Sequence, residues 1–430
     1  MATTAATSAP TRLGGRTWTS LVILGLVGQL AWAVENMYLN LFVYDTITDD
    51  PTAIAVMVAA SAITATLATF LVGAASDRLR KRRIFIAGGY VLWGLSTAAF
   101  GFVSVDGIAT IAAAGNAVVI TVVAVILLDC IMSLFGSGAN DAAFNAWVTE
   151  STVPSNRGRV EGVLSVMPLL AMLIVFGGFD GLTQAGQWRE FFIIIGLLTT
   201  SVGVLAWFLV KDAPTMQAQT DGYLKAVLHG LRPSVMRATP QLYVTLAVLA
   251  VVSIGAQVFM PYLIIYIQRY LRIDGYAIVL GSVLLSAAIL SVIGGRVIDR
   301  VGKVQFMTPA ILIFAAGLAA MFFVRGMVPV ILAGIVMITG LMLTLASTSA
   351  TIRDYTPADR VGNVQGLRMI AAVLIPMIIG PFIGSSVIIG ANETYLDLGV
   401  EKQVPTPWIF VAAAIVVLLA LIPVRKLAKS

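Results

Sequence analysis

Charged residues are scarce in this sequence. Asp, Glu, Lys and Arg make up only 11% of the 430 residues, whereas soluble domains carry about 25%. Hydrophobic residues make up 59%, and a water-soluble fold could not cover that much apolar surface with so few charges. The composition therefore predicts a protein that is embedded in a lipid bilayer.

Cysteine and histidine are scarcer still. Cys130 is the only cysteine, which excludes an intrachain disulfide and a metal site built from several cysteines. His229 is the only histidine and lies in a polar stretch, which argues against histidine-based catalysis inside the membrane. The sequence also lacks a phosphate-binding loop and a nucleophile–base set. We therefore expect no enzymatic activity, no cofactor and no bound metal.

Long apolar segments dominate what is present. A transmembrane helix needs about 20 mostly apolar residues. Twelve segments of that length occur, at 20–44, 52–75, 84–103, 117–149, 160–179, 190–210, 241–267, 277–298, 305–324, 329–351, 364–389 and 407–424. The fourth is too long for one perpendicular span, so we expect it to be tilted or to begin at the interface. The prediction is an all-α polytopic membrane protein.

The basic residues support this count of spans. They form short clusters between the apolar segments, which membrane topology explains better than nucleic-acid binding does. With both termini in the cytoplasm, 22 of the 27 lysines and arginines fall on the inner side, as is usual for cytoplasmic loops. The Ala- and Val-rich spans are typical of a bacterial inner membrane, where we expect a monomer surrounded by lipid.

The longest polar stretch divides the chain into two halves. The expected order is a disordered N-terminal tail (1–19), a six-helix bundle (20–210), a cytoplasmic linker (211–240), a second six-helix bundle (241–425) and a C-terminal tail (426–430). Within the linker, residues 222–231 have the pattern of an amphipathic helix on the inner membrane surface.

Two loop sequences of the first half recur in the second. The loops after spans two and eight read GAASDRLRKRR (73–83) and GGRVIDRVGK (294–303), which share Gly-x-x-x-Asp-Arg. The loops after spans four and ten read VPSNRGRVEG (153–162) and TPADRVGNVQG (356–366). Duplicated halves related by an axis along the membrane normal predict a cavity between them, near the midplane.

With these motifs, residues 20–425 resemble the major facilitator superfamily. The pattern from Gly73 to Arg82 is similar to the signature of that family after span two, although Arg80 stands where the family usually has glycine. The resemblance implies two pseudo-symmetric six-helix bundles and transport by alternating access. A carboxylate at the inner mouth can cap the positive start of a helix from the other half, so Asp77 would meet the start of span eleven and Asp299 the start of span five.

The resemblance thus implies a cytoplasmic gate of acidic and basic side chains. Its expected members are Asp77, Arg78, Glu150, Arg157, Arg159, Asp299, Arg300 and Arg360. The alternative is that the basic residues only set the topology.

Three carboxylates lie inside predicted spans and away from their first two residues. A charge near the bilayer centre costs about 2.5–3.5 kcal/mol on insertion scales, so intramembrane acids are functional candidates. Glu35 is the leading candidate for a proton carrier, and Asp129 and Asp141 are candidates for ion coupling or substrate contact. The alternative for Glu35 is a structural hydrogen bond to another span.

A polar stripe in span one suggests the solute. Gln29, Trp32, Asn36 and Asn40 share one helical face, and such a stripe with an aromatic ring suits a sugar. The substrate-binding candidates are Gln29, Trp32, Asn36, Asn140, Asn145, Gln257 and Tyr262.

The stretch GQLAWAVE (28–35) is similar to span one of sucrose-type symporters, and the loops resemble those of glycoside–pentoside–hexuronide symporters. Span two has no carboxylate, which disfavours sodium coupling. We expect proton-coupled import of a sugar or related polar solute. The alternatives are a drug or metabolite exporter, which would have a Met- and Phe-lined cavity, and a non-transporting receptor or lipid scramblase.

Overall fold

The computed structural model describes residues 13–110, 116–212, 232–356, 361–397 and 400–427. Within them, twelve helical stretches are long and apolar enough to cross a membrane, which confirms the expected number of spans. They are Gly15–Thr46, Pro51–Leu79, Arg82–Phe102, Ala117–Ser151, Arg159–Gly178, Trp188–Leu209, Pro240–Tyr270, Tyr276–Ile298, Lys303–Phe323, Met327–Asp354, Gly366–Ala391 and Trp408–Leu427.

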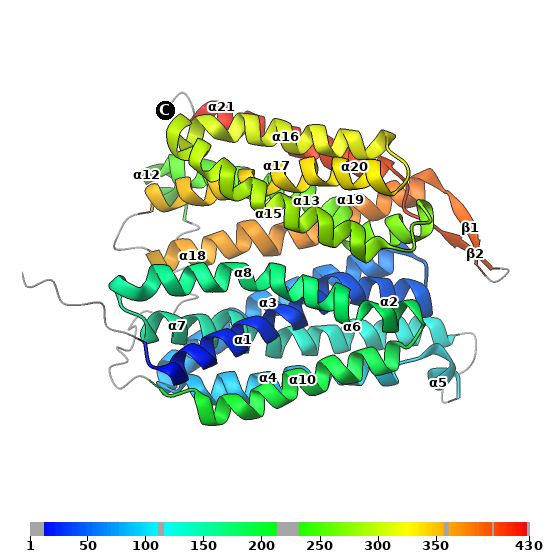
Figure 1. Ribbon diagram of the computed structural model, residues 1–430, viewed down its shortest axis with the longest axis horizontal. Coiled ribbons are helices and arrows are strands. Elements are labelled where there is room, and N and C mark those ends of the chain that lie inside the picture. Colours follow the sequence, from blue (N-terminus) through cyan, green and yellow to red (C-terminus); the bar gives the residue numbers. More distant parts are fainter. Residues whose placement is uncertain (1–12, 111–115, 213–231, 357–360, 398–399, 428–430) are drawn as a thin grey trace, which may run out of the picture.

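The first six spans form an N-terminal bundle. Its elements are α1 (Gly15–Ala33), η1 (Val34–Tyr38), α2 (Leu39–Thr46), α3 (Pro51–Leu79), α4 (Arg82–Ala99), η2 (Phe100–Phe102), α5 (Val105–Ala109), α6 (Ala117–Gly136), η4 (Ser137–Phe144), α7 (Asn145–Ser151), α8 (Pro154–Gly178), α9 (Asp180–Gln184) and α10 (Trp188–Leu209). Figure 1 shows this bundle in its lower half.

The last six spans form a C-terminal bundle, in the upper half of Figure 1. Its elements are α12 (Pro233–Ala238), α13 (Pro240–Phe259), η5 (Met260–Tyr262), α14 (Leu263–Ile265), η6 (Tyr266–Tyr270), α15 (Tyr276–Val301), α16 (Lys303–Phe323), α17 (Met327–Asp354), α18 (Val361–Met369), η7 (Ile370–Leu374), α19 (Ile375–Ala391), β1 (Thr394–Asp397), β2 (Val400–Gln403), α20 (Trp408–Leu419) and α21 (Leu421–Leu427).

Local sequence explains where several helices begin. Pro51 opens α3, and the carboxylate of Asp50 accepts a hydrogen bond from the backbone N–H of Thr52 at 2.8 Å. Proline also stands in the first turn of α8 (Pro154) and α13 (Pro240), where its missing N–H costs no helical hydrogen bond.

Four of the described spans contain a π-helical segment, namely η1, η4, η6 and η7. A π-helical turn inserts one residue, leaves backbone carbonyls without their usual partner and turns side chains away from the α-helical register. The segments η1 and η4 lie in spans one and four, and Glu35 and Asp141 are within them. Pro261 interrupts span seven as a 3₁₀ turn between α13 and α14.

Small residues allow close helix contacts inside each bundle. A Cβ on Gly94 of α4 would collide with the backbone of Gly196 in α10, so glycine is needed at this crossing. Between the bundles, α3 packs against α19 and α8 packs against α15. These contacts, together with those of α2, α3 and η1 against η5, form the seam along which the halves meet.

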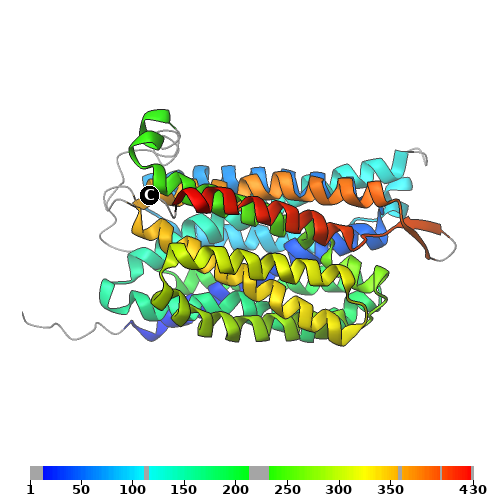
Figure 2. The same cartoon turned by 90° about the horizontal axis from the view of Figure 1, so that it is seen from above.

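The two ends of the molecule differ. The helix α1 begins and α21 ends at one end, here called the terminal end, while the strands β1 and β2 project from the opposite, hairpin end (Figures 1 and 2). The strands pair antiparallel, with Thr394 opposite Gln403. A hydrogen bond from Lys402 lowers the pKa of Asp397 within this hairpin.

The structure differs from the sequence-based expectations at the N-terminal tail and in the loop before the last span. The predicted tail over residues 1–19 is too long, because α1 already begins at Gly15. The polar loop predicted over 390–406 contains the β-hairpin, which hydropathy did not indicate. The interfacial helix expected at 222–231 lies outside the described residues.

Candidate functional site

A cluster of acidic and polar side chains lies buried in the N-terminal bundle. Glu35 of η1 is 8% exposed and accepts a hydrogen bond from Ser133 of α6 at 2.6 Å. Asp129, one turn earlier on α6, is 2% exposed and lies within reach of the hydroxyl of Ser61 on α3. Glu35 Oε2 and Asp129 Oδ1 each lack a hydrogen-bond partner among the described residues. Spans one, two and four thus bring two carboxyl groups into one apolar interior.

The carboxylate of Glu35 has acidic neighbours. Asp129 and Asp141 lie close enough to repel a charge on it, and none of the ion pairs among the described residues includes Glu35. An ion pair that would neutralise the cluster is therefore missing at Glu35. The three predicted coupling residues are brought together, although Glu35 is 94 positions from Asp129 and 106 from Asp141 in the sequence.

A second set of polar groups extends the cluster toward the terminal end. Tyr90 of α4 donates to the carbonyl of Leu24 at 2.8 Å, and its hydroxyl is 2.9 Å from Asn140 Oδ1. A Cβ on Gly28 would lie 2.6 Å from both Asn140 Oδ1 and the Tyr90 hydroxyl. Gly28 is therefore needed for this contact between spans one, three and four.

A polar cavity of ≈ 530 Å³ adjoins this set on the terminal side. Its polar lining comes from spans one, four and five and consists of Gln29, Asn140, Asp141, Asn145, Thr149, Glu161 and Ser165. The lining contains two carboxylates and no lysine or arginine. Gln29, Asn140, Asp141 and Asn145, all predicted as site residues, meet here.

The predicted polar stripe of span one does not act as a unit. The amide of Asn36 donates to the carbonyl of Trp32 at 2.8 Å, and the amide of Asn40 donates to that of Asn36 at 2.9 Å. Because η1 shifts the helical register, these amides serve backbone carbonyls of their own helix. Trp32 packs against Trp93 with ring centroids 5.2 Å apart. Sequence periodicity could not reveal this, since it assumes an unbroken α-helix.

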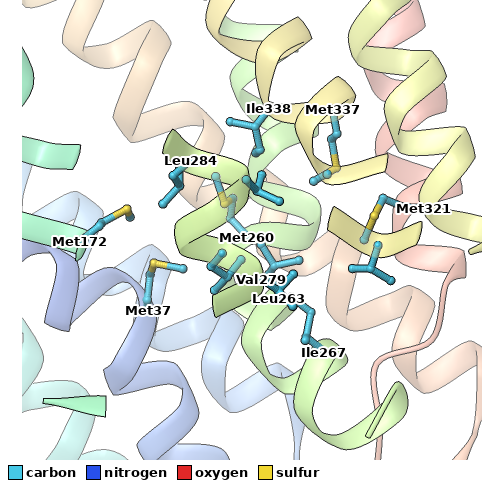
Figure 3. A pocket seen from close by; sticks show the side chains of 14 residues that line it. Met37, Met172, Met260, Leu263, Ile267, Val279, Leu284, Met321, Met337 and Ile338 are labelled. Atoms are coloured by element: carbon cyan, nitrogen blue, oxygen red, sulfur yellow. The ribbon is translucent and has the colours of Figure 1, made fainter. Parts of the chain in front are cut away.

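A second cavity, of ≈ 50 Å³, lies between the bundles and is lined only by apolar side chains and Gly334. Met37 and Met172 enter it from the N-terminal bundle, and Met260, Met321 and Met337 from the C-terminal bundle (Figure 3). The remaining lining residues are Leu263, Ile267, Val279, Leu280, Val283, Leu284, Val330 and Ile338. The sequence analysis did not assign a role to any of these residues.

The bundles are joined at the hairpin end. Tyr262, predicted to bind substrate, instead donates toward the carbonyls of Pro51 (3.0 Å) and Pro381 (2.9 Å), one in each bundle. Arg269 pairs with Asp45 across the seam at 2.7 Å. Gln257, another predicted binding residue, packs against Gly380 within the C-terminal bundle.

Two further contacts reinforce this closure. The backbone N–H of Gln403 in β2 donates to Asp49 at 2.6 Å, and its carbonyl accepts from Tyr44. The buried carboxylate of Asp180 in α9 accepts from Tyr38 at 2.9 Å and from Tyr276 of the other bundle. Sequence reasoning missed these partners, because residues more than 90 positions apart carry no local signal of pairing.

The terminal end has a different arrangement. Arg82, which is buried, pairs with Asp77 and with Glu150 at 2.7 Å, all within the N-terminal bundle. Among the described residues, the ion pair of Asp77 is thus made within its own bundle, and its predicted contact with the start of span eleven stays a prediction. Arg82 was not among the predicted gate residues, since five basic residues follow Asp77 and the sequence does not single one out.

The other predicted gate residues are scattered. Arg157 donates to Thr152 and Thr149 of its own bundle, and Arg159 lies over the ring of Trp18 at 5.3 Å. Arg78 and Arg300 are exposed, and Asp299 lies in the last turn of α15. Arg360 is outside the described residues.

Comparisons with known proteins agree with this architecture. The model of the Major Facilitator Superfamily matches residues 21–280 and again residues 245–429. The chain belongs to the major facilitator superfamily. No curated protein matches it.

Solved structures of this superfamily share the fold. The crystal structure of the nucleoside transporter NupG matches with a TM-score of 0.71 at 13% identity, over 96% of this chain and 98% of that one. A bacterial homolog of the human lysosomal transporter Spinster, in an inward-facing and occupied conformation, matches with a TM-score of 0.70 at 12% identity, over 96% and 97% of the two chains. Its unoccupied form matches with a TM-score of 0.65 at 15% identity, over 96% and 94%. The chain is thus a transporter of the membrane and not an enzyme.

Proposed function

We propose that this major facilitator protein is a proton-coupled secondary transporter of a small organic solute, in which Glu35 and Asp129 hold the transported proton. The observation that carries the proposal is the buried pair of carboxyl groups with no basic partner at Glu35. Two carboxylates sharing a site of low dielectric cannot both be ionised, since each charge opposes the other and neither is hydrated. At least one of them therefore carries a proton.

The two ends of the molecule supply the alternating access. With both termini in the cytoplasm, the closed hairpin end faces outward and the structure is the inward-facing state. The polar cavity then offers Asp141 as a relay between the buried pair and the inner solution. Opening the hairpin end requires the Arg269–Asp45 and Tyr262 contacts to separate. In that outward-facing state, we expect Arg82, Asp77 and Glu150 to form new contacts that hold the inner side closed.

Two solute classes fit this scheme. Import of a sugar is supported by the amides of Gln29, Asn140 and Asn145, which can pair with hydroxyl groups at the polar cavity. The second candidate is export of a drug or metabolite with an apolar group. The methionine-lined cavity favours it, because sugar hydroxyls would find no partner there.

Glu35→Gln tests the proposal. In proteoliposomes with a pH gradient, we expect this variant to lose net solute accumulation while keeping solute exchange across the membrane, because the solute site remains but no proton is carried. A potential of 100 mV provides about 2.3 kcal/mol per charge. This free energy sustains about a fiftyfold concentration ratio of solute across the membrane, so its loss is large enough to measure. The panel contains sugars and organic cations.

Glu393→Gln serves as the matched control, because Glu393 is an exposed acid outside the spans. It should accumulate solute as the unmodified protein does. Proton-driven accumulation that is unchanged in Glu35→Gln would remove Glu35 from the mechanism.

A further inference from the structure

We propose that the methionine-lined cavity is a binding subsite for the apolar group of an amphipathic organic cation, whose charged group is held by the acidic side of the N-terminal bundle. This deepens the proposed function, because it names the class of solute that such a transporter would carry. The evidence comes from the lining of the two cavities and from their places in the fold.

The lining of the apolar cavity selects against polar groups. It contains side chains of Met, Leu, Ile and Val together with Gly334, with no donor or acceptor to replace water (Figure 3). A hydroxyl or a charge placed here would lose its hydration without compensation. An aryl or alkyl group loses nothing, and the solute must therefore carry one to use this space.

The methionines explain how a small cavity can admit a ring. At ≈ 50 Å³ the cavity now has room only for a small alkyl group. Five of its lining side chains are methionines, each unbranched, with three rotatable bonds and a polarizable sulfur that makes favourable contacts with aromatic rings. Turning these side chains enlarges the space without moving the backbone, and it also allows apolar groups of different shape.

The position of the cavity fits a transported group. Met37 and Met172 belong to one bundle and the other lining residues to its partner bundle. A group bound there contacts both halves in the present state and loses its contacts with Met37 and Met172 when the halves separate. A purely structural void within one bundle would not change in this way.

The charges near the two cavities determine which charged group the solute can carry. Met37 and Glu35 both belong to the five-residue segment η1, so one short helical segment contributes to both the apolar cavity and the carboxyl cluster. The polar cavity adds Asp141 and Glu161, with no basic residue in its lining. An anionic solute would be repelled by every charge in these linings, whereas a cation would be attracted and would compete with the proton for the carboxylates.

Binding of two matched pairs of probes tests the proposal. Tetramethylammonium and phenyltrimethylammonium share a cationic group and differ by one ring. Methyl glucoside and phenyl glucoside share a sugar group and also differ by one ring. Affinities are measured by titration calorimetry on the purified full-length protein, without a proton gradient. We expect phenyltrimethylammonium to bind about tenfold to a hundredfold more tightly than tetramethylammonium, as burial of a ring predicts.

Substitution of the lining separates this subsite from general hydrophobic binding. Met337→Gln keeps the side-chain length but places an amide in the cavity, and we expect the gain from the ring to fall below about threefold. Met327→Gln, on the exposed first turn of the same helix, should keep the full gain. Met260→Gln repeats the test from another helix should the first variant fold poorly.

Each remaining outcome decides against part or all of the proposal. No gain from the ring, or a gain that survives both lining substitutions, would overturn the subsite. Ring-dependent binding of the glucosides but not of the ammonium ions would overturn the cationic solute in favour of a sugar. Because binding is measured at equilibrium, these results are independent of whether Glu35→Gln abolishes proton-driven accumulation.

Discussion

The two halves of the molecule share a fold but have opposite interiors. The spans of the N-terminal bundle bury Glu35 and Asp129 and open onto a polar cavity. The described spans of the C-terminal bundle contain no acidic residue apart from Asp354, at the end of α17, and supply most of an apolar cavity. Helix packing was retained after duplication, whereas the chemistry of the interior diverged. The cavity of the first half is thus lined by acidic and polar side chains, whereas the second half contributes mainly apolar side chains to the other cavity.

The loops after spans two and eight give the sharpest comparison, because they share the pattern Gly-x-x-x-Asp-Arg-x-x-Lys. In the first, Arg82 is 5% exposed at its side chain and is shared by Asp77 and Glu150. In the second, the side chains of Lys303 and Asp354 pair at 2.6 Å but are 36% and 52% exposed. The same motif therefore supports a buried network in one half and a solvated ion pair in the other.

Alanine substitution at these two basic residues should produce the largest difference between the halves. Arg82→Ala leaves two partly buried carboxylates without their cation, which costs about 3–5 kcal/mol of stability. Lys303→Ala should change stability by less than about 1 kcal/mol, because water screens the exposed pair. Unfolding of the purified protein in detergent, followed by tryptophan fluorescence, measures both. Equal effects would show that burial does not distinguish the two loops.

Gly28→Ala addresses the polar interior of the first half and should have a smaller effect. Its Cβ would press on Asn140 and the Tyr90 hydroxyl, forcing their contact apart at a cost of about 1–3 kcal/mol. Gly88→Ala is the matched control, since a Cβ there meets nothing within 4 Å. The unfolding measurement again applies, and a stable Gly28→Ala variant would mean that the N-terminal bundle adapts more easily than its packing suggests.

The sequence predicted the spans well because hydropathy over about 20 residues is a strong signal. It also identified Glu35, Asp129 and Asp141, since acids inside a span are conspicuous. It did not reveal the π-helical segments, nor that the amides of Asn36 and Asn40 donate to backbone carbonyls of their own helix. Nor could it assign partners across the seam, such as Tyr262 to Pro51, because these depend on which end of the molecule is closed.

One aligned position of the two loops, Arg80 in the first and Gly302 in the second, allows a fine test. Arg80 caps α3 with φ 54°, a left-handed conformation, and Gly302 stands at the corresponding position of the second loop with φ 101°. An L side chain with positive φ costs about 1–2 kcal/mol. Glycine avoids most of this cost, but its backbone loses more conformational entropy on folding, which costs about 0.5–1 kcal/mol. Arg80→Gly should therefore stabilise the protein by about 0.5–1 kcal/mol. Gly302→Ala should destabilise it by at least as much, because φ 101° is further from the conformations that alanine tolerates. Opposite signs in the same unfolding assay would show that both positions require a positive φ. A destabilised Arg80→Gly would mean that the arginine side chain contributes more at this turn than its backbone costs.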